Sequence, residues 1–182
     1  GLVLRAIRLQ PIPVGHSVFF SRADLGTLLE GADEEGVMTA RESELVQRIL
    51  DFSSTRVEEV MTPRVDMVAA PVDLDRPELE ALAISARHSR IPVYRRTIDD
   101  VVGYLKVRDF LLDPDRRREL LIRPVAIFPE RARASKVFYE MQRRRTAMAV
   151  VVNEYGETVG LLTREDLIEE VVGDIYDEYE VA

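Results

Sequence analysis

The sequence of 182 residues contains no cysteine and only two histidines, His16 and His88. Without cysteine, the chain cannot form disulfide bonds, thiolate zinc sites, iron–sulfur clusters or a thiol nucleophile. It also lacks the G-x-x-x-x-G-K-[ST] phosphate loop and a histidine pair at metal-ligand spacing. We therefore predict no catalytic residues, and the sequence indicates a protein that is not an enzyme.

Long apolar runs and an excess of basic charge are missing as well. No stretch approaches the roughly 18 to 20 apolar residues of a membrane-spanning helix. The formal net charge of -8 argues against the extended basic surface that binds nucleic acid, so we expect no such partner. Hydrophobic residues make up 46% and charged residues 32%, which is typical of an ordered, soluble domain or compact pair of domains.

The first third of the chain differs from the rest in its pattern. Prolines and a glycine near the start predict an extended linker over residues 1–20. Residues 21–55 predict two short acidic helices, since capping boxes begin at Ser21 and Thr39 and apolar residues follow at spacings of three and four. Residues 177–182 form an acidic tail.

From Val57 onward the sequence repeats itself at a distance of 57 residues. The segment 102–111 lies over 159–168, and the segment 91–94 lies over 148–151. Such self-similarity indicates two copies of one supersecondary unit.

Each copy predicts the order β-α-β-β-α, with copies over 56–115 and 116–176. The first helix is expected over 77–87 in one copy and over 135–144 in the other. Because a unit of this size buries little surface alone, the copies should pack together about a pseudo-twofold axis. The predicted fold class is α+β, preceded by the short acidic helices.

Ordered motifs in both copies resemble a tandem CBS pair, and more narrowly the CorC/CNNM family of magnesium transporters, which includes haemolysin-like proteins. The motifs are Val57 to Arg64, His88 to Tyr94, Gly103 to Asp109, Val151 to Gly156 and Gly160 to Leu167. The acidic segment before them resembles the one that joins the membrane domain to the CBS pair in this family. The resemblance covers roughly residues 38–175.

The resemblance implies a cytoplasmic regulatory module of a larger protein in the cell (inner) membrane. A four-helix membrane domain would precede residue 1, and in many members a CorC-HlyC domain would follow residue 182. The module would form a homodimer through its CBS pairs, bind ATP with Mg²⁺, and couple binding to magnesium transport. A structural dimerisation module without nucleotide, or the CBS pair of another membrane protein, stay open as alternatives.

The family resemblance also implies the residues of the nucleotide site. They are Thr62, His88, Ser89, Arg90, Ile91, Pro92, Leu161, Thr163 and Asp166. Most of them have a structural alternative: a turn for Thr62, a helix end for His88, a surface ion pair for Arg90, and the core for the apolar residues.

The pair Thr163 and Asp166 has the spacing of a capping box, which is its structural alternative. The same helix N-terminus offers free N–H groups and a positive dipole end to a phosphate, and Asp166 can accept bonds from ribose hydroxyls. The first copy has Lys106 in place of Thr163, and lysine offers no acceptor. We predict one competent site per chain, with Mg²⁺ held by the nucleotide phosphates rather than by protein ligands.

Overall fold

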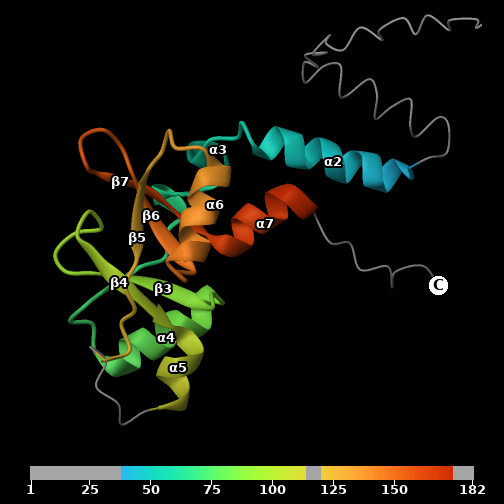
Figure 1. The fold of residues 1–182 in the computed structure, drawn as a ribbon. Coiled ribbons are helices and arrows are strands. Elements are labelled where there is room, and N and C mark those ends of the chain that lie inside the picture. Colours follow the sequence, from blue (N-terminus) through green and yellow to red (C-terminus); the bar gives the residue numbers. More distant parts are fainter. Residues whose placement is uncertain (1–37, 114–119, 174–182) are drawn as a thin grey trace, which may run out of the picture. The chain divides into compact units, whose positions relative to one another are not determined.

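The computed structural model describes residues 38–113 and 120–173, and Figure 1 shows its helices and strands. The chain divides into two compact units, Gly1–Ser43 and Glu44–Ala182. The predicted linker, the helix expected after Ser21 and the acidic tail lie outside the described residues. No helix in the described ranges combines the length and the apolar character that crossing a membrane requires.

Helix α2 (Ala40–Phe52) begins with the capping box that the sequence predicts. The Thr39 N–H donates to the Glu42 carboxylate at 2.8 Å, and the Glu42 N–H donates to the Thr39 hydroxyl at 3.3 Å. The bond from the Thr39 backbone is the main reason why the pKa of Glu42 lies below its usual value. At the other end of α2, Phe52 is buried and meets Phe138 edge to face, with ring centroids 6.4 Å apart.

Three short elements follow and lead into the first copy. They are α3 (Val57–Val60), β1 (Thr62–Pro63) and the 3-10 turn η1 (Arg64–Asp66). Val57, at the start of α3, is fully buried and fixes this lead-in against the core of the second copy.

The first copy consists of β2 (Ala70–Pro71), α4 (Arg76–Ala86), β3 (Arg90–Tyr94), β4 (Val101–Lys106) and α5 (Val107–Leu112). Its sheet has the order β2-β3-β4, in which β2 and β3 are parallel and β3 and β4 antiparallel. The predicted order β-α-β-β-α is therefore confirmed.

The second copy repeats this arrangement with β5 (Ala126–Pro129), α6 (Ala134–Arg143), β6 (Met148–Val152), β7 (Thr158–Thr163) and α7 (Arg164–Val172). Strand β5 is parallel to β6, which is antiparallel to β7. Strand β1 adds to the far edge of β7, so the sheet has the order β1-β7-β6-β5.

The strand registers correct the sequence alignment of the two copies. Ile91 pairs with Leu105, and the matching pair in the second copy is Ala149 with Leu162. The first strands therefore correspond at a distance of 58 residues and the second strands at 57. The predicted superposition of 91–94 on 148–151 is wrong by one residue, because the β3–β4 turn is one residue longer than the β6–β7 turn.

The copies exchange short backbone pairings at their starts. Thr62 of β1 pairs with Leu161 in the sheet of the second copy. In the mirrored place, Arg123 and Tyr104 exchange two backbone hydrogen bonds of 2.9 Å in the sheet of the first copy. Each lead-in segment thus completes the sheet of the other copy, which is why the two copies form one compact unit.

Candidate functional site

A cleft of about 360 Å³ lies between the two copies. Its walls come from β1, from η1 and the segment after it, from the α4–β3 connection and β3, from the start of β6, and from the end of β7 and the start of α7. The lining residues are Thr62, Asp66, Met67, Val68, Arg87, His88, Ser89, Arg90, Pro92, Met148, Leu161, Thr163, Glu165 and Asp166. Eight of the nine residues predicted for the site are among them.

Ile91 is the exception, because it does not line this cleft. Its side chain is 1% exposed and packs in the core of the first copy. Successive side chains of a strand point to opposite faces. Arg90 and Pro92 therefore face the cleft, while Ile91 faces the core.

Sequence reasoning missed six lining residues, and one of them, Glu165, had a readable signal. Met148 occupies in β6 the place that Arg90 occupies in β3, but only the strand registers of the structure show this correspondence. Glu165 follows Thr163 by two residues at the start of α7, where an acidic side chain can turn back into the cleft. The remaining four have no repeating pattern: Asp66 ends η1, and Met67, Val68 and Arg87 lie in connections.

The N-terminus of α7 carries the predicted capping box. The Thr163 hydroxyl accepts the Asp166 N–H at 3.2 Å, and Oδ2 of Asp166 accepts the Thr163 N–H at 2.7 Å. Both side chains are therefore held in place at the cleft by the helix itself. Such a helix end is suited to an anion, because its first N–H groups point outward and the dipole is positive there.

Arg90 crosses the cleft to the second copy. Its Nη2 donates to the Glu165 carboxylate at 2.9 Å, and the arginine side chain is 20% exposed while that of Glu165 is 55% exposed. The Arg90 Nε is buried and has no hydrogen-bond partner in the described part of the protein. A phosphate that replaced Glu165 could use the planar fork of this guanidinium.

The mirrored positions of the first copy carry different side chains. Arg123 stands where the cleft has Thr62, and its Nη2 donates to Asp109 at 2.6 Å. Asp109 corresponds to Asp166, so its carboxylate is already engaged by a cation. With Lys106 at the position of Thr163, the first copy lacks the acceptor pair, which agrees with the prediction of one competent site.

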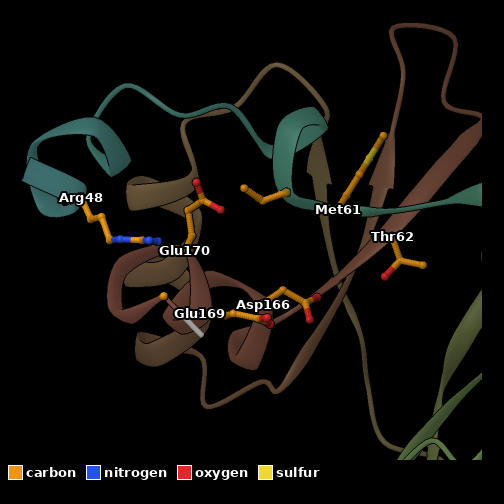
Figure 2. Close-up of a pocket in the computed structure, with 8 residues that line it drawn as sticks. Arg48, Met61, Thr62, Asp166, Glu169 and Glu170 are labelled. Atoms are coloured by element: carbon orange, nitrogen blue, oxygen red, sulfur yellow. The ribbon is translucent and has the colours of Figure 1, made fainter. Parts of the chain in front are cut away.

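A second cavity, of about 370 Å³, adjoins the first at Thr62 and Asp166 and is drawn in Figure 2. Figure 2 shows Asp166, Glu169 and Glu170 entering it from α7, and Arg48 reaching over from α2. Among the described residues, no three or more His, Asp or Glu side chains gather closely enough to hold a metal ion.

Comparison with known proteins decides the family. The model of the CBS domain matches residues 118–173. The CBS domain of a bacterial CNNM/CorC family Mg²⁺ transporter has a TM-score of 0.78 and 41% identity, over 87% of this chain and 99% of that one. This chain belongs to the CNNM/CorC family. The α+β fold of two tandem CBS motifs is thereby confirmed.

Two further relatives of this CNNM/CorC chain are informative about its ligand and its length. The CBS domain of a bacterial family member in complex with ATP has a TM-score of 0.67 and 40% identity, over 74% of this chain and 99% of that one. A UPF0053 protein of Mycobacterium tuberculosis is 34% identical over 172 residues, which are 90% of this chain and 40% of that protein. The chain spans 25% to 40% of the length of the first curated relatives that it matches.

Proposed function

We propose that this CBS pair is the regulatory module of a CorC-type magnesium transporter and binds one ATP, together with Mg²⁺, in the cleft between its copies. The observation that carries the proposal is the joint presence of Thr163, Asp166 and Arg90 around one cleft. The module senses the nucleotide and catalyses nothing. In the full-length protein it acts on a membrane domain from the cytoplasmic side.

The cleft offers a place for each part of the nucleotide. Asp166 can accept bonds from the ribose hydroxyls, and the N-terminus of α7 with Arg90 can bind the phosphates. Pro92, Met148 and Leu161 supply an apolar wall for the adenine ring. The ATP complex of the 40% identical bacterial CBS domain supports this assignment.

The outer face of the first copy supports a homodimer. A cavity of about 700 Å³ there is lined by Ala83 of α4 and by Leu111 and Leu112 of α5. Ile84 and Leu112 are 70% and 72% exposed. Leu111 and its counterpart Ile168 are 42% and 46% exposed, and a second copy of this chain can cover these apolar side chains.

Titration calorimetry with ATP and Mg²⁺ tests the proposal. Wild type is expected to bind about one nucleotide per chain, and Asp166→Ala to bind at least about tenfold more weakly, because a hydrogen bond to a charged group is worth about 1.5 to 3 kcal/mol. Light scattering on the same samples is expected to show a dimer.

Asp109→Ala is the matched control for Asp166→Ala, since it removes the corresponding carboxylate of the first copy. It is expected to leave ATP affinity unchanged. Asp166→Asn adds a second check, because asparagine keeps a cap acceptor for the Thr163 N–H while removing the charge. If wild type shows no heat and no stabilisation at millimolar ATP, a structural dimer with an empty cleft is the better account.

The Arg90–Glu165 pair leads to a separate prediction on magnesium. Without Mg²⁺, the triphosphate brings its full negative charge beside Glu165 and competes with it for Arg90. Glu165→Gln is therefore expected to raise the affinity for Mg²⁺-free ATP by about tenfold, and the affinity for MgATP by less. Titrations with MgCl₂ and with EDTA measure both values. Glu169→Gln is the control, because Glu169 lines the adjoining cavity; an equal gain in both variants would contradict the prediction.

A further inference from the structure

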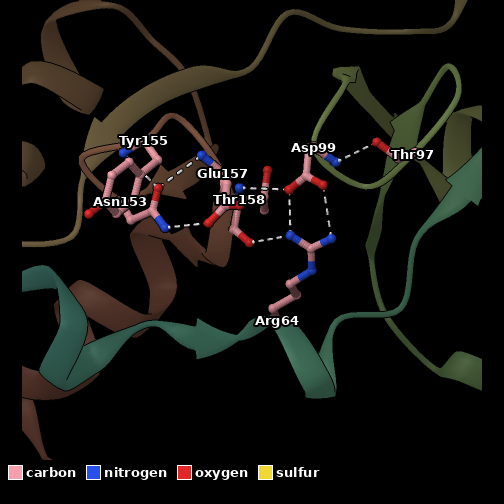
Figure 3. Close-up of polar contacts among 7 residues, drawn as sticks. All are labelled: Arg64, Thr97, Asp99, Asn153, Tyr155, Glu157 and Thr158. Carbon is pink, nitrogen blue, oxygen red and sulfur yellow. Dashed lines mark hydrogen bonds and ion pairs between the residues drawn. The ribbon is translucent and has the colours of Figure 1, made fainter.

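A side-chain clamp joins the two copies beside the cleft (Figure 3). The Arg64 guanidinium forms a two-pronged ion pair with Asp99, through Nη1 to Oδ1 and through Nη2 to Oδ2 at 3.0 Å. Nη1 of Arg64 also donates to the Thr158 carbonyl at 2.9 Å, and the Thr158 N–H donates to Oδ1 of Asp99 at 2.9 Å. The pair therefore satisfies both backbone groups of Thr158.

The clamp lies directly after the end of strand β1. Strand β1 pairs Thr62 and Pro63 with Leu161 and Gly160, and then the chain turns away into η1. Thr158, the first residue of β7, is 1% exposed, so its backbone groups need partners. The side chains of Arg64 and Asp99 provide what a longer β1 would have provided.

Asp99 comes from the β3–β4 turn of the first copy, which is one residue longer than the β6–β7 turn. The turn is shaped locally, because the Asp100 N–H donates to the Thr97 carbonyl at 2.8 Å and the Arg95 N–H donates to the Asp100 carbonyl at 3.0 Å. The second copy has Gly156 at the corresponding place, which offers no carboxylate. The clamp therefore serves only one of the two pseudo-symmetric positions.

That position is next to the competent cleft. Thr62 precedes Arg64 by two residues, and Asp66, Met67 and Val68 follow it, and all four line the cleft. We propose that Arg64 and Asp99 are positioning residues that hold this wall, residues 62–68, in the arrangement that accepts a nucleotide. The inference rests on the proposed function, and it adds a regulation of nucleotide affinity by contact between the copies.

The exposure of the clamp indicates how it acts. The side chains of Arg64 and Asp99 are 41% and 38% exposed, and ion pairs this open contribute little to global stability. The clamp is therefore expected to reduce local opening of the wall rather than to raise global stability. The Arg64 guanidinium is the main reason, and the Thr158 N–H the second, why the pKa of Asp99 lies below its usual value. Asp99 is thus ionised, as the clamp needs, throughout the neutral range.

Amide hydrogen exchange and ATP titration on the same variants test the clamp. Asp99→Ala removes the pair, Arg64→Lys keeps the charge but loses the fork, and Asp99→Asn keeps an acceptor for Thr158. Glu80→Gln is the matched control, because the Arg76–Glu80 pair on α4 is similarly exposed but lies outside the cleft.

In Asp99→Ala without ligand, the amides of residues 64–68 and of Thr158 are expected to exchange at least about tenfold faster, since they open locally. If the wall then has the nucleotide-binding arrangement in about a tenth of the molecules, ATP affinity falls about tenfold. Glu80→Gln changes neither value. Faster exchange with unchanged ATP affinity would overturn the positioning role, and unchanged exchange would overturn the clamp itself. Absence of ATP binding in wild type would instead count against the proposed function, and the exchange data would still judge the clamp.

Discussion

Gly160→Ala is expected to lower the free energy of unfolding by about 2 to 3 kcal/mol and to weaken ATP binding at least about thirtyfold. A Cβ at this position would lie 2.5 Å from the Thr62 carbonyl oxygen and 2.8 Å from Sδ of Met61. The backbone oxygen cannot swing aside, so β1 must move away from β7. Because Thr62 lines the cleft, the same movement is expected to open the proposed nucleotide site.

Gly103→Ala is the matched variant in the first copy. There the Cβ would lie 2.4 Å from the Arg123 carbonyl oxygen, so the mirrored strand exchange is disturbed to a similar degree. A comparable loss of stability is expected, but with ATP affinity kept, since Arg123 does not line the proposed nucleotide cleft. Urea unfolding and ATP titration below the unfolding transition measure the two effects. Equal loss of affinity in both variants would contradict the assignment of the site to one cleft.

The repeated elements were predictable because each has a strong local period. The helices expected over 77–87 and 135–144 are observed as Arg76–Ala86 and Ala134–Arg143, displaced by one residue. The alignment of the first strands failed for a physical reason. Strand β6 is buried along most of its length, so its apolar residues show no alternation that fixes a register. Only the backbone pairing reveals the shift.

The same contrast applies to the site. The helix N-terminus with Thr163 and Asp166 was predictable, because a capping box is a local signal. The period of two along β3 would have placed Ile91 in the core, opposite Arg90 and Pro92, had it been applied. The ion pair of Arg90 with Glu165 and the clamp of Arg64 with Asp99 join residues 75 and 35 positions apart. Contacts of this kind leave no local pattern in one sequence.

The second large effect is expected in the core of the first copy, where Phe110 anchors α5. Its side chain is buried in the smaller of the two clusters, and the Arg76 guanidinium lies 4.4 Å from its ring centroid. Phe110→Ala is expected to cost about 3 to 5 kcal/mol, since it leaves a cavity and removes this cation–π contact. Urea unfolding at fixed protein concentration measures the loss.

Two further variants serve as comparisons for the unfolding of Phe110→Ala. Leu167, the counterpart of Phe110 in α7, is fully buried in the core of the second copy, and Leu167→Ala is expected to cost about 2 to 5 kcal/mol. Ile127→Ala, on the exposed face of β5, is expected to change stability by less than about 0.5 kcal/mol. Because the copies exchange strands, both core variants are expected to unfold in one transition. A separate early transition in Phe110→Ala would mean that the exchanged strands do not couple the two cores.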